Sequence, residues 1–299
     1  MSGPMLPTLR QLQYLKLLAE HRSFSRAAEA AHVSQPALSA GVQELEKILG
    51  GPVVERTRGA IQLTPIGAEA VKRAEDVLSR AEDLVEAARN AGRPLSGRLR
   101  LGVIPTVAPF LLPRSLPGLK ARYPGLKLFI REDLTPRLIT GLKAGQLDCA
   151  VIALPYQATG IAHARIGDDE ILAVAPSDHP LAGDTPIRPG ELKADDLILL
   201  EDGHCLRDQA LAAVDIEAPR GEDVFAATSL HTLVQMVSSG LGVSFLPQMA
   251  VSAGLADAPG VVVRPFAAEA PRREIVVAWR SGSSREADAR LLAEALRLD

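Results

Sequence analysis

Hydrophobic residues recur at helical spacing through the first fifty positions and predict several short helices. Ser23 and Ser25 interrupt the first run, and a short Ala-rich helix then extends to Ala31. His32 and Val33 predict a tight connection to the next helix. The apolar positions before and after this connection are Leu9, Leu12, Leu15 and Leu18, then Leu38, Val42, Leu45 and Leu49. Two short helices joined by a tight turn indicate a helix-turn-helix.

The next signals are a helix cap and a small hairpin. Ser34 has the side chain of an N-cap, and Pro36 falls in the first turn, where a missing N–H costs little. Residues 52–55 and 61–63 predict the two strands of a hairpin, which would form a wing beside the helix-turn-helix. The basic residues near the tip of this wing are Arg56 and Arg58.

A long helix is predicted from about residue 65 to residue 91. Thr64 and Pro65 supply an N-cap and a first-turn proline, and the helix would be roughly 40 Å long. Its seam positions, at alternating steps of four and three, are Ala70, Ala74, Val77, Ala81, Leu84 and Ala88. Such a seam favours pairing with the same helix of a second copy, and the alternative is packing on its own domain.

Beyond Gly92, strands alternate with helices. This order indicates an open α/β sheet, and because the segment exceeds about 200 residues we expect two Rossmann-like lobes. Expected strands are Leu99–Ile104, Leu126–Ile130, Leu147–Leu154, Ile171–Val174, Leu197–Leu200, Val243–Leu246 and Ile275–Ala278. The predicted fold is therefore a mostly helical winged helix-turn-helix domain (1–64), a linker helix (65–92) and an α/β domain (93–299). Lobe I is expected over about 97–166 and 267–299, and lobe II over about 167–266.

Composition narrows the class of protein. The 299 residues are 47% hydrophobic and 23% charged, which indicates a globular rather than a disordered chain. The formal net charge of -3 gives no global basic field, so nucleic-acid binding would need a local patch; residues 1–66 form the net-positive zone. Two cysteines exclude a disulfide scaffold and a cysteine-built zinc site. We see no signal peptide or membrane-spanning run and expect a cytoplasmic protein without membrane contact, metal or cofactor.

Cys205 carries the strongest chemical signal. It lies at or next to the first turn of a predicted helix, and helix N–H groups together with His204 and Arg207 favour the thiolate. We therefore expect a lowered pKa for this thiol, although Asp208, which can take or relay a proton, opposes the shift. The alternative is a small buried hydrophobic residue. Cys149, in a strand core without adjacent cations, is interpreted as inert.

Other candidate residues give weaker signals. Thr106 follows a strand and Thr135 begins a helix, so each can present a hydroxyl and an N–H to a small polar ligand. Arg272 and Arg273 form a basic pair that indicates little by itself. No spacing typical of a metal site or a Ser/His/Asp triad stands out.

Several motifs together resemble the LysR-type transcriptional regulators over the entire chain. The motifs are Val33-Ser34-Gln35-Pro36-Ala37-Leu38-Ser39, Glu55-Arg56-Thr57, Leu63-Thr64-Pro65 with Gly67, and Gly240-Leu241-Gly242-Val243. The resemblance implies double-stranded DNA as partner, with Ser34, Gln35, Pro36 and Ser39 facing the groove. Gln43 stands where many relatives have a basic residue, so attraction to phosphates would depend on Arg22, Arg26, Lys47, Arg56 and Arg58.

The α/β domain further resembles the peroxide-responsive OxyR branch of that family. The matching runs are Gly102-Val103-Ile104-Pro105-Thr106, residues 200–210, Ala227-Thr228-Ser229 and Pro271-Arg272-Arg273. The resemblance implies that Cys205 reacts with peroxide, that Thr106 and Thr135 hold it, and that His204, Arg207 and Asp208 serve the same pocket. Arg272 and Arg273 are the further candidates for effector binding.

One departure concerns the resolving cysteine that OxyR proteins usually carry nine positions later, where this chain has Val214. An oxidised Cys205 would then persist as a sulfenic acid, form a mixed disulfide with a small thiol, or bond to Cys149 or another subunit. We favour the first two routes.

The preferred hypothesis is a sequence-specific regulator that senses an oxidant at Cys205, which requires that sulfur to be kept ionised. It would be a homodimer through the linker helix and, by family resemblance, a homotetramer that engages RNA polymerase. A second hypothesis is a LysR-type regulator that reversibly binds a small anion or organic effector between the lobes. The third is an enzyme, a thiol peroxidase, which the lack of a resolving partner disfavours.

Overall fold

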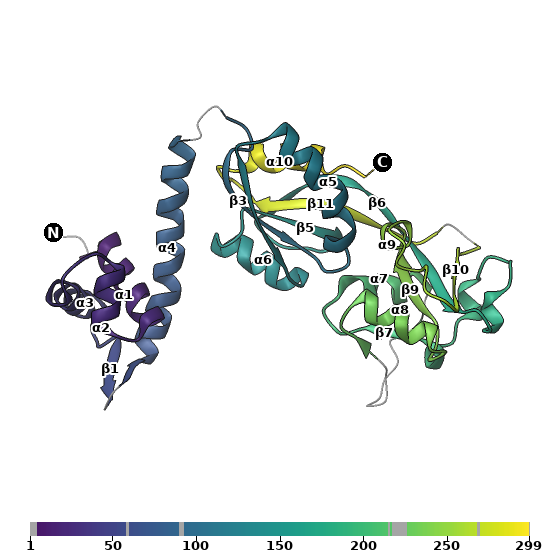
Figure 1. Ribbon diagram of the computed structural model, residues 1–299, viewed down its shortest axis with the longest axis horizontal. Coiled ribbons are helices and arrows are strands. Elements are labelled where there is room, and N and C mark those ends of the chain that lie inside the picture. Colours follow the sequence, from purple (N-terminus) through teal and green to yellow (C-terminus); the bar gives the residue numbers. More distant parts are fainter. Residues whose placement is uncertain are drawn as a thin grey trace. The chain divides into compact units, whose positions relative to one another are not determined.

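The computed structural model describes residues 5–57, 60–89, 93–214, 216, 226–267 and 270–298. The chain divides into two compact units, Met1–Ala91 and Gly92–Asp299. Each unit has its own buried core, so each is described separately (Figure 1).

The first unit contains the predicted helix-turn-helix. Its helices are α1 (Leu9–His21), α2 (Phe24–Ala30) and α3 (Gln35–Leu49), capped by Thr8, Ser23 and Ser34 respectively. The α2–α3 connection turns at His32, whose φ of 54° is left-handed. The Val33 N–H donates to the Ala28 carbonyl at 3.0 Å. Most of the predicted apolar positions meet in the core, which confirms the helical periodicity, but Leu9 and Leu49, at the outer ends of the two runs, are exposed.

The wing is also present. Strands β1 (Val54–Thr57) and β2 (Ala60–Leu63) pair antiparallel, with Thr57 opposite Ala60. The backbone of Arg56 therefore belongs to β1, one step nearer the body of the hairpin than expected. Nothing is described of the Arg56 side chain, and Arg58 lies outside the described residues.

Helix α4 (Pro65–Arg89) begins where the sequence predicts. The Thr64 hydroxyl accepts the Gly67 N–H at 2.9 Å and donates to the Pro52 carbonyl at 2.6 Å, so one side chain caps the helix and ties it to the wing. Early residues of α4, Ala70 and Val71, pack on the helix-turn-helix core. Apolar side chains farther along are exposed, with Leu84 at 72%.

The second unit is built on a seven-stranded mixed sheet with the order β10-β6-β11-β5-β3-β4, to which β9 adds by pairing with β6. Strands β3 (Gly97–Val103), β4 (Leu126–Glu132) and β5 (Cys149–Leu154) are parallel. Strand β11 (Arg272–Arg280) runs antiparallel to both β5 and β6 (Ile161–Pro176). Helices α5 (Ala108–Arg122) and α10 (Glu286–Ala295) lie on one face and α6 (Thr135–Ala144) on the other (Figure 1).

The remaining elements belong to the part of the unit expected as lobe II. They are β7 (Leu199–Leu200), α7 (Cys205–Val214), β8 (Ala226–Ala227), α8 (Leu230–Ser238), β9 (Ser244–Pro247), α9 (Gln248–Ser252) and β10 (Val261–Arg264). Three short 3-10 helices span Pro180–Ala182, Pro189–Glu191 and Ala194–Asp196. Strands β7 and β8 form a separate parallel pair.

Strand β6 is far longer than expected. The sequence predicts a strand only over residues 171–174, whereas β6 has sixteen residues and continues from one lobe into the other (Figure 1). Its first half alternates apolar with polar residues and ends in Asp168, Asp169 and Glu170, a composition that is unfavourable in strands. Pairing with β11 over residues 161–170 supplies the stability that local propensity lacks.

The contact between α4 and the wing gives a stability prediction. A Cβ at Gly67 would lie 1.9 Å from the carbonyl oxygen of Val53, and backbone cannot yield as a flexible side chain does. We expect Gly67→Ala to lower the free energy of unfolding by about 1–3 kcal/mol through overpacking, as measured by urea unfolding. The matched control is Gly118→Ala in α5, where an added Cβ meets nothing within 4 Å. It should be neutral or stabilising, and equal effects of the two substitutions would contradict the close contact.

Candidate functional site

Cys205 begins α7, as the sequence predicts, and lies beside the first residue of α6. The Thr135 hydroxyl is within hydrogen-bonding reach of the sulfur. Thr135 is only 2% exposed, yet its hydroxyl has no nitrogen or oxygen partner among the described residues. A buried hydroxyl without a partner is costly, so this atom is poised to bond a small polar molecule next to the sulfur.

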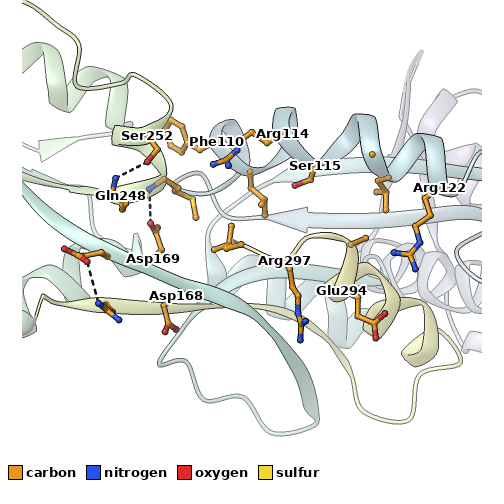
Figure 2. Close-up of a pocket in the computed structure, with 18 residues that line it drawn as sticks. Phe110, Arg114, Ser115, Arg122, Asp168, Asp169, Gln248, Ser252, Glu294 and Arg297 are labelled. Carbon is orange, nitrogen blue, oxygen red and sulfur yellow. Dashed lines mark hydrogen bonds and ion pairs between the residues drawn. The ribbon is translucent and has the colours of Figure 1, made fainter.

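Arg273 supplies the positive charge of the site. It is fully buried and donates from Nη1 to the Thr106 hydroxyl at 2.7 Å and from Nη2 to the Thr106 carbonyl at 3.0 Å. Nε and Nη2 also donate to Asp169 Oδ2, at 3.0 and 2.8 Å. The other carboxylate oxygen of Asp169 accepts the Met249 N–H at 2.9 Å (Figure 2). This network joins the end of β3, strands β6 and β11, and α9.

The structure corrects the expected pKa of Cys205. Burial raises the pKa of the thiol, and this effect outweighs the opposing influence of Arg273, the Thr135 hydroxyl and the Leu206 N–H. Asp208 raises the pKa further, as the sequence indicates. At neutral pH the resting sulfur is therefore mainly a thiol, and a redox function cannot rest on a thiolate that exists beforehand.

The predicted cations beside Cys205 do not act on it. Burial lowers the pKa of His204, so its imidazole is neutral near pH 7 and supplies no positive charge. Arg207 pairs with Asp202 at 2.8 Å and donates to the Leu200 carbonyl at 3.3 Å. Asp208 is exposed in the first turn of α7. The favourable charge comes from Arg273 instead, 68 positions away in the sequence.

The side chains of Arg272 and Arg273 lie on opposite faces of β11, because successive residues of a strand point to opposite faces. Arg272 is exposed and lies 3.8 Å from Glu170, away from Cys205. Asp169, the partner of Arg273, was missed in the sequence analysis. An acidic residue within a strand is unusual and could have drawn attention to Asp169. That argument is not available from the sequence, because the predicted strand begins only at residue 171, whereas β6 includes residue 169.

A cavity of about 330 Å³ opens beside this network, at the carboxyl ends of β3, β4, β7 and β8. Thr106 and His204 belong to its walls, together with Thr228 and Ser229 near the start of α8. The His231 and Phe110 rings, stacked at 6.3 Å, form another wall. Ligands of open α/β sheets bind at such strand ends, so the position suits a small effector.

The second cysteine lies elsewhere. Cys149 is fully buried at the amino end of β5, opposite Leu101 of β3, and burial raises the pKa of its thiol. The site around Cys205 instead gathers residues that follow the carboxyl ends of β3 and β4. At the far end of β5, about 17 Å from Cys149, the Leu154 carbonyl accepts a hydrogen bond from Gln209 of α7 at 2.8 Å. Val214, at the end of α7, is buried among apolar residues.

In the first unit the candidate DNA-contact residues cluster at the start of α3. Gln35, Pro36 and, about two turns later, Gln43 are exposed, whereas Ser39 is half-buried. The Ser34 hydroxyl already accepts the Ala37 N–H at 3.4 Å as the helix cap. Arg26 is exposed on α2. Within the described residues, no cluster of His, Cys, Asp or Glu could hold a metal and no helix could cross a membrane.

Two family models match the chain. The bacterial regulatory helix-turn-helix protein of the lysR family matches residues 9–68, and the LysR substrate binding domain matches residues 92–298. The DNA-binding transcriptional dual regulator OxyR of Escherichia coli K12 is 40% identical over 290 residues, which cover 97% of this chain and 94% of that protein. A probable hydrogen peroxide-inducible genes activator of Streptomyces viridosporus is 42% identical, with the same coverage.

Among solved structures, a full-length OxyR of Pseudomonas aeruginosa with a cysteine-to-aspartate substitution superposes with a TM-score of 0.74 at 38% identity, covering 98% of both chains. A Corynebacterium glutamicum OxyR variant with H2O2 bound superposes with a TM-score of 0.65 at 35% identity, covering 98% of this chain and 94% of that one.

The charges of Arg273 and Asp169 predict that two variants shift the pKa of Cys205 in opposite directions. Asp169→Asn leaves the positive charge of Arg273 uncompensated, so the pKa of Cys205 should fall and its alkylation at pH 7 should accelerate about threefold or more. The double variant Asp169→Asn with Arg273→Gln removes both charges, so the pKa should rise and alkylation should slow. Iodoacetamide rates at the Cys205 peptide, measured from pH 6 to 10 by mass spectrometry, distinguish the two.

In the unsubstituted protein the alkylation rate should rise about tenfold per pH unit from pH 7 to 8.5 without a plateau, because the pKa is raised. A plateau near pH 7 would show an ionised thiol and contradict the structure. Circular dichroism checks that each variant is folded. If Asp169→Asn alone unfolds, the alkylation rate can still be measured in the double variant, which retains neutral hydrogen-bonding groups at both positions. Shifts of the same sign in both variants would show that Arg273 does not set the charge at the sulfur.

Proposed function

Because this chain belongs to the LysR-type transcriptional regulators and is similar to OxyR over nearly its whole length, we propose that it regulates transcription in response to hydrogen peroxide. Oxidation of Cys205 would be the sensing event. The observation that carries the proposal is the buried hydroxyl of Thr135, which has no nitrogen or oxygen partner among the described residues and lies beside a thiol that Arg273 also influences. The names of the relatives support peroxide as the inducer.

The sensing step balances without a cofactor. The ionised sulfur attacks one oxygen of H2O2, an S–O bond forms and the O–O bond breaks. The thiol proton ends on the departing hydroxide, so the products are a cysteine sulfenic acid and water; the sulfur loses two electrons and the peroxide gains them. The buried guanidinium of Arg273 can stabilise the departing negative charge.

The raised pKa is compatible with this chemistry. A thiolate of higher pKa is a stronger nucleophile, which offsets part of the loss in the ionised fraction. Peroxide can bond to the Thr135 hydroxyl, which has no nitrogen or oxygen partner among the described residues, and to Thr106, whose hydroxyl accepts from Arg273 and still has a proton to donate. Selectivity then comes from binding a small ligand in place, while the resting thiol is protected from other electrophiles.

The fate of the oxidised sulfur follows from what lies near it. Val214 has no thiol. Cys149 lies at the amino end of β5, whereas α7, which begins with Cys205, contacts the carboxyl end of that strand. A disulfide needs the Cα atoms of its two cysteines within about 7 Å of each other. We therefore keep the sulfenic acid or a mixed disulfide with a small thiol as the oxidised form.

DNA binding is assigned to the exposed start of α3, with Gln35 suited to a bidentate contact with adenine. Ser34, Pro36, Ser39 and Gln43 would lie in or beside the groove, and Arg26 on a phosphate. The wing residues Arg56 and Arg58 remain proposed phosphate contacts. Target DNA places the protein in the cytoplasm.

Dimerisation is assigned to α4. Val77, Leu84 and Val85 leave large apolar side chains exposed along its second half, which is the arrangement of a helix that pairs with a second copy. A homotetramer and contact with RNA polymerase follow from the family resemblance. Signalling would be a shift between two packings of the α/β domain, because the Arg273 network connects elements of both lobes.

A second candidate function keeps the regulator but gives it a reversibly bound small anion as effector. The cavity of about 330 Å³ favours it, since Thr228, Ser229 and His231 offer polar groups to such a ligand. The comparisons support a regulator rather than a thiol peroxidase, so the enzymatic alternative is not favoured.

Operator footprinting tests the proposed function. We expect peroxide to change the footprint of the unsubstituted protein, because oxidation alters the packing that spaces the DNA-binding domains. Cys205→Ser should bind the operator with a footprint that peroxide leaves unchanged, and Cys149→Ser should respond normally. A peroxide response that persists in Cys205→Ser would overturn the assignment of the sensor.

Mass mapping tests the oxidised form. After stoichiometric peroxide, nonreducing digestion should yield a Cys205 peptide that carries one added oxygen, trapped by dimedone, or a small-thiol adduct. Adding glutathione should convert the first species to the second. A Cys149–Cys205 cross-linked peptide would show that the two cysteines can approach each other, and it would refute the proposed fate of the oxidised sulfur.

A further inference from the structure

The α/β unit has a second cavity, of about 670 Å³ (Figure 2), which shares Phe110 with the cavity beside Thr106. Its walls are α5, α9, the end of α10 with the residues after it, and neighbouring segments of β6 and β11. Neither Cys205 nor Thr106 nor Thr135 lines it. The volume lies within the range of small-molecule sites, about 300–1,000 Å³.

Polar side chains, among them Asp169 and Gln248, line part of this cavity. The apolar part of its inner surface comes from buried residues of α5 and α9, which are Phe110, Leu111, Leu119 and Met249, with Leu298 half-buried on the opposite side. Such a surface favours the hydrocarbon or aromatic body of a ligand, because burying apolar area is worth about 25 cal/mol per Å².

The charges around the opening are not balanced. Three acidic residues of the lining are already neutralised: Asp168 by Arg165, Asp169 by Arg273 and Glu170 by Arg272. The other basic residues, Arg114, Arg122 and Arg297, have no acidic partner among the described residues, and they face a single further acid, Glu294. The opening therefore has a surplus of positive charge.

Arginine residues lie on both walls of this cavity. Figure 2 shows Arg114, Ser115 and Arg122 on α5, with Glu294 and Arg297 across the opening. Arg114 and Arg122 are about 12 Å apart along α5, and Arg297 follows α10 on the other wall of the cavity. Arginine forms bidentate hydrogen bonds with carboxylates, which suits this site to a carboxylate ligand.

We propose that this cavity binds an organic carboxylate, with the charged group between Arg114 and Arg297 and an apolar body on the inner surface. The assignment goes beyond the proposed peroxide response and requires neither peroxide nor DNA. It gives the regulator a second small-molecule site on the face of the unit formed by α5 and α10.

The site is connected to the sensor through Asp169. One of its carboxylate oxygens accepts the Met249 N–H at the cavity wall, and the other holds Arg273, which reaches Thr106. A bound anion adds negative charge to the cavity whose wall includes Asp169, and this charge opposes ionisation of Cys205. Occupation of the cavity should therefore make Cys205 less reactive.

Calorimetric titration of the reduced, full-length protein tests binding, with 4-phenylbutyrate as probe and 4-phenyl-1-butanol as its uncharged match. We expect saturable binding of the acid and binding of the alcohol at least about tenfold weaker. The double variant Arg114→Gln with Arg297→Gln should weaken binding of the acid by about tenfold or more, whereas Arg188→Gln, at another exposed arginine, should not.

Equal affinity for the acid and the alcohol, no saturable binding, or unchanged affinity in the double variant would overturn the site. Folding of the variants is checked by circular dichroism and by their affinity for DNA. The link to the sensor is tested separately by the iodoacetamide rate at Cys205. Saturating 4-phenylbutyrate should slow it about twofold or more, and the double variant should lose this effect. A rate that stays unchanged while the probe is bound would remove the link.

Discussion

The buried ion pair of Arg273 with Asp169 is the constraint on which the α/β unit depends. Two fully desolvated charges are tolerated only when their hydrogen-bonding groups are satisfied, and here the backbone of α9 and both oxygens of Thr106 complete the set. Losing one partner of such a pair costs about 3–5 kcal/mol. The end of β3, the two long strands and α9 are therefore held in one arrangement.

The same pair explains why the thiol is not ionised at rest. Arg273 is the charge that lowers the pKa of Cys205, yet its guanidinium is already paired with the Asp169 carboxylate, and the thiol is largely buried. Desolvation then exceeds the remaining attraction. A sensor built this way limits side reactions with bulky electrophiles, and it gains reactivity only when a ligand brings its own hydrogen bonds into the pocket.

The local features of the fold could be predicted from the sequence because local groups create them. Ser34 caps α3, Thr64 caps α4, and Cys205 begins α7, each through side chains and backbone a few residues apart. The Arg273–Asp169 pair joins residues 104 positions apart, so no pattern along one sequence could reveal it. The sequence predicts a lowered pKa for Cys205, and this direction is wrong. Arg207, near Cys205 in the sequence, pairs with Asp202 instead, and the burial that raises the pKa cannot be judged from the residues adjacent in sequence.

Signalling without a second sulfur demands that noncovalent contacts supply the energy of the switch. Moving a two-state equilibrium from 1:99 to 99:1 takes about 5.5 kcal/mol. A disulfide could deform α7 by covalent constraint, whereas a sulfenic oxygen acts only through the groups it touches. Hydrogen bonds to charged groups contribute about 1.5–3 kcal/mol each, so displacing the two that Arg273 donates to Thr106 approaches the required amount. Because these bonds belong to the network that joins the lobes, one added oxygen is positioned to change their packing.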